Sequence, residues 1–195
     1  MTSPSNSFGL VRYAHIFSSA VREILESTLL RETSSLPLTL PQFHLLKLMA
    51  INGKHQVGEV AHFLGVSAPA ATKNIDKLEG LGLVVRSPQE GDRRATLLSV
   101  SEKGRKLVRK YEELKISKLA PVLQGFTEEE LRQLTSLLRR FAISLYETEG
   151  PGNGACLRCS AYIEPGCPVG HVRGGCPYQS ARKSDEVPLE GREPN

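Results

Sequence analysis

The stretch VGEVAHFLGVSAPAATKNIDKLEGLGLVVR, residues 57–86, carries the clearest structural pattern of the chain. Its first part carries apolar residues at the spacing of one helical face, namely Val57, Val60, Ala61 and Leu64. Gly65 and Val66 then give a tight turn, and Ser67 is a residue type that caps the start of a helix. The first half of the stretch therefore predicts a short helix that ends in a turn.

A second helix is predicted directly after this turn. Pro69 suits the first turn of a helix, and Gly80 and Gly82 mark its end. Between them an apolar stripe consists of Ile75, Leu78 and Leu81. Two short helices joined by a glycine-containing turn are typical of a helix-turn-helix.

The residues after the second helix change to the composition of strands. Residues 83–85, LVV, and residues 95–100, ATLLSV, are short and rich in β-branched side chains. The linking segment 86–95 is polar and contains a proline and a glycine as turn formers. This pattern predicts a β-hairpin with a basic tip, which carries Arg86, Arg93 and Arg94.

Two helices are predicted before the motif. The first has a stripe at spacings of three and four, consisting of Leu10, Ala14, Phe17, Val21, Ile24 and Thr28. The segment 34–37, SSLP, interrupts it. Thr39 is a suitable N-cap for the second helix, which contains the apolar run FHLLKLMAI and stops at Asn52-Gly53.

Two further helices are predicted after the hairpin. One runs from Ser101 to about Gln124, with Pro121 as a kink or an end. A capping box of Thr127 and Glu130 opens the other, whose stripe consists of Leu131, Leu134, Leu138, Phe141 and Leu145. The first and last helices both carry narrow apolar seams, which suit pairing with a second chain as well as packing within one chain. We expect a mainly α fold with a small β-hairpin wing, that is, a winged helix-turn-helix.

Positive charge is concentrated in the middle of the chain. The whole protein has a formal net charge of +4, whereas residues 67–110 alone hold ten Lys or Arg and five Asp or Glu, a balance of +5. A basic segment indicates contact with a polyanion, although a solvated face of mixed charge has the same composition.

Several side chains in this segment suit duplex DNA. The second helix of a helix-turn-helix enters the major groove, and residues near its start reach the base edges. Those residues are Ser67, Ala68, Ala70, Thr72, Lys73 and Asn74, while Lys77 lies one turn further on and suits a phosphate. The basic tip, with Arg86, Arg93 and Arg94, suits phosphates or the minor groove. Asp92 would hold one of these arginines in position through a bidentate bond.

Other function classes find little support in the sequence. No run of apolar residues is long enough to span a bilayer, and the first residues lack the features of a signal peptide, so we expect a cytoplasmic protein with no membrane partner. We find no paired carboxylates, no nucleophile with a base and no phosphate-binding glycine loop. We therefore expect that the protein is not an enzyme.

Residues 10–147 resemble the MarR family of winged-helix transcriptional regulators. The resemblance rests on the helix order, on the block at 57–86, and above all on GDRRATLLSVSEKGRKL at 91–107, which is similar to the wing signature of the family. It implies a homodimer with intertwined N- and C-terminal dimerisation helices, each protomer placing a recognition helix in the major groove of a pseudo-palindromic site. It also implies a small-molecule effector, or cysteine oxidation, as a candidate signal.

All four cysteines lie in the segment 156–176, CLRCSAYIEPGCPVGHVRGGC, beyond this resemblance. They are Cys156, Cys159, Cys167 and Cys176. Stable disulfides are not expected in the cytoplasm. The segment has few apolar residues to bury, so a thiolate-bound metal would supply the folding energy that a small module lacks.

Zinc and an iron-sulfur cluster both accept four thiolates. Only Cys156 and Cys159 are closely spaced, whereas zinc ribbons usually present two close pairs. The dipeptides Cys167-Pro168 and Cys176-Pro177 are similar to the end of the bacterial ferredoxin run. The sequence therefore favours an iron-sulfur cluster of the 4Fe–4S type, with zinc as the alternative.

These expectations divide the chain into three parts. They are a winged-helix DNA-binding and dimerisation domain at 1–149, a cysteine-rich metal-binding segment at 150–179, and a disordered, charged tail at 180–195. The main hypothesis is a homodimeric DNA-binding regulator that senses redox, oxygen or metal state through the cysteines. The alternatives are a regulator with a structural zinc knot and a small-molecule effector, or a cluster-bearing redox enzyme or electron carrier.

Overall fold

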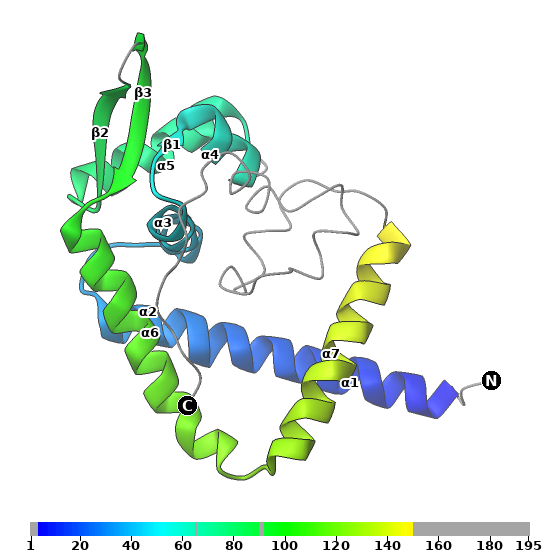
Figure 1. The fold of residues 1–195 in the computed structure, drawn as a ribbon. Coiled ribbons are helices and arrows are strands. Elements are labelled where there is room, and N and C mark those ends of the chain that lie inside the picture. Colours follow the sequence, from blue (N-terminus) through cyan, green and yellow to red (C-terminus); the bar gives the residue numbers. More distant parts are fainter. Residues whose placement is uncertain (1–3, 65, 90–91, 150–195) are drawn as a thin grey trace.

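A computed structural model describes residues 4–64, 66–89 and 92–149. Within them, helices surround a three-stranded antiparallel sheet in the order β1-β3-β2 (Figure 1). The elements are α1 (Pro4–Ala20), the π-helix η1 (Val21–Thr28), α2 (Leu29–Thr33), α3 (Leu40–Asn52), β1 (His55–Gln56), α4 (Val57–Leu64), α5 (Ala68–Gly80), β2 (Val84–Gln89), β3 (Asp92–Val100), α6 (Glu102–Leu123) and α7 (Glu128–Glu149). This confirms the predicted fold class, a mainly α winged helix.

Side chains cap three of the helices at their predicted starts. At α3, Gln42 joins the predicted N-cap Thr39 in a reciprocal capping box. The Ser101 hydroxyl accepts the Gly104 N–H at 3.0 Å and starts α6. Thr127 and Glu130 form the predicted box before α7. These side chains satisfy amides that the first turn of a helix leaves without a backbone partner.

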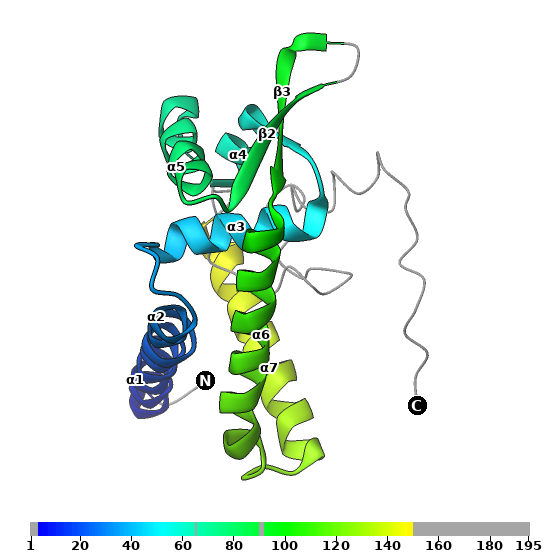
Figure 2. The same cartoon turned by 90° about the vertical axis from the view of Figure 1, so that its left-hand side faces the viewer.

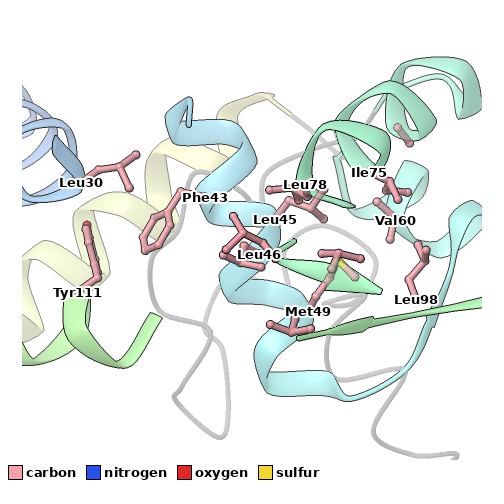
Figure 3. Close-up of a cluster of buried hydrophobic side chains, with 14 of the residues drawn as sticks. Leu30, Phe43, Leu45, Leu46, Met49, Val60, Ile75, Leu78, Leu98 and Tyr111 are labelled. Carbon is pink, nitrogen blue, oxygen red and sulfur yellow. The ribbon is translucent and has the colours of Figure 1, made fainter. Parts of the chain in front are cut away.

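The core lies on both sides of α3 (Figure 3). Leu45, Leu46 and Met49 lie toward α5 and the sheet, in one cluster with Ile75 of α5 and Leu98 of β3. At the other end of α3, the ring centroid of Phe43 lies 4.5 Å from that of Tyr111 in α6. One buried helix therefore joins the helix-turn-helix to the long helices.

The hairpin differs from the expectation in length. The sequence predicts a tip of residues 86–95, but β2 runs to Gln89 and β3 begins at Asp92. The sequence does not predict strands here, because this polar part of the wing lacks the alternating apolar residues that indicate a strand. Pro88 is compatible with β2 because β2 is an edge strand, where a missing N–H costs no ladder bond. The short strand β1 was also missed, and it pairs His55 with Leu98.

The start of α6 approaches the turn between α5 and β2 very closely. A β-carbon on Gly104 would lie 2.4 Å from the Leu83 carbonyl oxygen and 2.6 Å from Cγ1 of Val100. Only a residue without a β-carbon permits this approach, which fixes the direction in which α6 leaves the winged helix (Figure 2).

Gly104→Ala should therefore lower the free energy of unfolding by about 2 kcal/mol or more, because the backbone oxygen of Leu83 cannot move aside cheaply. Gly58→Ala is the matched control, since no atom lies within 4 Å of a β-carbon at that helical position. Gly58→Ala should change the free energy of unfolding by no more than about 1 kcal/mol. Urea denaturation of both variants makes the comparison, and equal stabilities would contradict the close approach.

Candidate nucleic-acid interface

Helix α5 presents one face to solvent and buries the other. Ala71, Ile75 and Leu78 are buried against the core. The exposed residues from the N-cap to the end of the helix are Ser67, Ala68, Pro69, Lys73, Asp76, Lys77 and Gly80. Of the predicted contact residues, Ser67, Ala68, Lys73 and Lys77 are thus exposed. The face carries two lysines and one aspartate, and lysines are the residues that suit contact with a polyanion.

Three of the predicted contact residues, Ala70, Thr72 and Asn74, are half-buried. The Thr72 hydroxyl donates to the Ala68 carbonyl at 2.9 Å. The Asn74 amide nitrogen donates to the Ala70 carbonyl at 3.0 Å, and its oxygen accepts from the Gln42 side chain at 3.4 Å. The side chain of Asn74 therefore lies between α5 and α3. Base contact by these residues stays a prediction.

Ser67 occupies the N-cap position with an extended backbone, as predicted, but its side chain makes no capping hydrogen bond. The first helical turn instead depends on Pro69, which needs no amide partner, and on backbone bonds such as Ala71 N–H to Ser67 C=O at 3.0 Å.

The wing carries its arginines in a different arrangement from the expected one. Arg86 was placed on the tip, but it lies in β2 beside α5. Its guanidinium pairs with Asp76 at 2.5 Å and also with Glu79. Asp92, Arg93 and Arg94 belong to β3, and their side chains lie outside the described part of the structure. Their contacts with DNA stay predictions.

A polar junction connects the long helices to α3. Lys47 of α3 is buried and pairs with Glu112 of α6, and Lys115 pairs with the same carboxylate at 2.5 Å. Burial lowers the pKa of Lys47, against the effect of Glu112. Burial also raises the pKa of Glu112, but hydrogen bonds from Lys115 and Lys47 outweigh it and hold that pKa below its usual value.

The same junction reaches the N-terminal helices. The Tyr111 hydroxyl donates to the Leu25 carbonyl in the π-helix η1 at 2.7 Å. Glu26 of η1 lies 3.6 Å from His44 of α3, and burial raises the pKa of Glu26 despite the nearby positive charge of Arg22. The sequence does not predict this junction, because its charged residues are scattered over three helices. The junction joins η1 and α6 to α3, and α3 in turn contacts α5.

The long helices expose many apolar side chains. On α1 and η1 they are Phe8, Leu10, Val11, Tyr13, Ile16, Phe17 and Ile24. On α7 they are Leu134, Leu137, Leu138 and Leu145. Figure 1 shows α1 running below the winged helix and α7 rising from the lower end of α6, to one side of the sheet. These surfaces contain the seams that the sequence predicted, and the described chain leaves them facing solvent.

The four predicted metal ligands Cys156, Cys159, Cys167 and Cys176 lie outside the described residues. Among the residues that are described, no group of three or more His, Cys, Asp or Glu side chains is arranged to hold a metal ion. The described helices likewise include none that is both long and apolar enough to cross a bilayer.

Comparison with known proteins agrees with this geometry. A model of the MarR family matches residues 38–96. RV1404 from Mycobacterium tuberculosis is 23% identical with a TM-score of 0.62, over 73% of this chain and 94% of that one. A MarR family protein from Bacillus stearothermophilus is 23% identical with a TM-score of 0.62, over 74% and 99%. FabT from Streptococcus pneumoniae, in complex with DNA, is 20% identical with a TM-score of 0.60, over 72% and 99%. The chain has the MarR winged-helix fold.

One buried histidine lies where the wing joins the helix-turn-helix. His55 of β1 is 2% exposed and pairs with Leu98 of the wing strand β3. Its Nδ1 lies 3.7 Å from a carboxylate oxygen of Glu59 in α4. Burial lowers the pKa of His55, although Glu59 opposes the shift.

The winged helix should therefore lose stability in mild acid. As the pH falls below about 6.5, the unfolded chain takes up a proton at His55 more readily than the folded chain, at a cost of at most about 1.4 kcal/mol per pH unit. Urea denaturation at about pH 7.5 and about pH 5.5 measures the loss. His55→Gln should reduce the difference between the two pH values. An unchanged difference in that variant would assign the acid sensitivity to another group.

Proposed function

We propose that the protein is a transcriptional regulator of the MarR family that binds duplex DNA as a homodimer. The observation that carries the proposal is the exposed face of α5, which presents Lys73 and Lys77 next to the wing in a chain of MarR fold. In this proposal α5 is the recognition helix, and its exposed N-terminal residues Ser67 and Ala68 approach the base edges in the major groove.

The phosphate backbone would supply most of the affinity. Lys73 and Lys77 lie one helical turn apart on the exposed face and suit phosphates on the rim of the groove. Arg93 and Arg94, whose backbone belongs to the antiparallel wing, would add phosphate or minor-groove contacts, with Asp92 orienting one of them. A regulator of this kind needs no catalytic group, so we do not propose an enzyme.

The homodimer is proposed on the exposed apolar side chains of α1, η1 and α7. A soluble protein rarely leaves so many large apolar side chains of its long helices in water. A second copy would cover them in a two-fold arrangement, and the two recognition helices would then face an inverted repeat in the DNA.

Replacing both lysines tests the interface. Lys73→Ala/Lys77→Ala should weaken binding to a fragment selected from random duplexes by at least about tenfold, and should reduce the slope of log affinity against log salt by about one per lost phosphate contact. Arg132→Ala is the matched control, because this exposed arginine pairs with Glu129 on α7, far from α5 (Figure 1). Equal salt slopes for both variants would remove Lys73 and Lys77 from the interface.

We propose that the cysteine segment binds a metal centre and provides the signal. The proposal rests on the clustering of all four cysteines and on the two Cys-Pro dipeptides. Four thiolates fit an iron-sulfur cluster, with zinc as the alternative, and the cluster would make DNA binding depend on redox, oxygen or metal state. With structural zinc, the signal would instead be a small-molecule effector.

Purification without oxygen separates these cases. We expect a brown protein with broad visible absorbance, whose colour is lost in Cys156→Ala/Cys159→Ala. A colourless protein with stoichiometric zinc would overturn the iron-sulfur proposal. If the double variant binds DNA and responds to oxidant as the native protein does, the segment has no sensing role.

A further inference from the structure

Two carboxylates lie on the proposed recognition helix where they would weaken DNA binding. Asp76 is exposed between Lys73 and Lys77, and Glu79 lies one turn after Asp76 on the same side of α5. A carboxylate near a phosphate backbone repels it and competes with the lysines for counter-charge. If α5 binds DNA, these two negative charges must therefore be offset by a nearby positive charge.

Arg86 of β2 contacts both carboxylates at once. Nη2 lies 2.5 Å from Oδ1 of Asp76, and Nη1 contacts Oε2 of Glu79. The two arms of one planar guanidinium thus hold two positions of α5, which fixes both the distance and the rotation of β2 relative to the helix. A lysine, with a single ammonium on a flexible stem, could not reproduce this geometry.

The turn between α5 and β2 is closed by other bonds. Leu83 N–H donates to the Leu78 carbonyl at 2.9 Å, the Ser101 hydroxyl donates to the Gly82 carbonyl at 2.7 Å, and Lys103 donates to the Leu81 carbonyl at 2.8 Å. Arg86 is not needed to close this turn. Its ion pairs act further along β2, where the strand leaves the turn and the wing begins.

We propose that Arg86 is a positioning residue for DNA binding, which locks the wing to the recognition helix through Asp76 and Glu79 and does not itself contact DNA. The proposal rests on the proposed function, because it concerns the same interface. The lock sets the angle between α5 in the major groove and the wing beside it. It also neutralises the carboxylates on a surface that must approach phosphates.

If Arg86 holds the wing to α5, the variant Asp76→Asn/Glu79→Gln should lose affinity for DNA, although it loses two negative charges. Removing two negative charges from a DNA-binding surface normally strengthens binding. Here the variant should bind the selected fragment about three- to tenfold more weakly than the native protein, because the wing loses its anchor on α5. In an Arg86→Gln background the same two substitutions should cause no further loss, because the lock is already absent. A double-mutant cycle of this kind would show that Arg86 acts together with Asp76 and Glu79.

Specificity separates positioning from a direct phosphate contact. Arg86→Gln and Arg86→Lys should both lose affinity for the selected fragment while keeping affinity for a random-sequence duplex, because the phosphate contacts remain. Arg132→Gln and Glu129→Gln, a matched ion pair on α7, should change neither affinity. Thermal melts confirm folding. If Arg86→Gln does not fold, the test rests on the two isosteric substitutions at the surface of α5.

The outcomes are distinct. Native protein that selects no DNA sequence would overturn the proposed function, and the role of Arg86 with it. Native protein that binds DNA, with Asp76→Asn/Glu79→Gln binding as tightly or more tightly, would overturn the lock alone. Arg86→Lys with native affinity would also overturn it, because charge would then suffice in place of the two-armed geometry.

Discussion

The burial of α3 is the constraint on which the rest of the domain depends. Leu45, Leu46 and Met49 are almost inaccessible to water, and they pack under α5 and the wing. The same helix meets α6 through the contact of Phe43 with Tyr111 and the ion pair of Lys47 with Glu112. Because protein interiors are closely packed, α3 cannot move relative to one set of neighbours without disturbing the other. A displacement of the long helices would therefore reach α5.

Polar groups at the start and in the middle of α3 complete this connection. Gln42 serves the capping box of α3 and also bonds Asn74 of the proposed recognition helix. Lys47, in contrast, carries a buried charge whose removal would leave Glu112 poorly compensated. The π-helix η1 meets the same region through Leu25 and Glu26. The π-helix η1, which exposes part of the apolar surface, is thus joined by directional bonds to α6 and α3, and α3 bonds the helix proposed to read DNA.

Much of this fold could be predicted from the sequence, because its signals are local. The caps at Thr39, Ser101 and Thr127 have sequence patterns that depend on neighbouring residues alone. The spacing of Ile75 and Leu78 likewise defines the buried face of α5. The wing was predicted too short, since strand pairing there is carried by polar residues and an edge proline rather than by alternating apolar residues.

The candidate site was less predictable, because its decisive features are contacts between distant residues. Composition identified Lys73, Lys77 and Arg86 as basic, but it could not separate exposed lysines from an arginine engaged by two carboxylates. Asn74 has the chemistry of a base-reading residue, and only its bond to Gln42, 32 positions earlier, shows that it faces α3. Charge and residue type thus predict the surface, whereas the roles of single residues depend on tertiary contacts.

We propose that two copies of this chain, bound to each other, read one inverted repeat. Sedimentation of the protein with a duplex that it has selected from a random library measures how many chains bind one duplex. A homodimer should give a complex of two 21.4 kDa chains per duplex and a selected sequence with two-fold symmetry. One chain per duplex on an asymmetric sequence, or selection of no sequence, would contradict it.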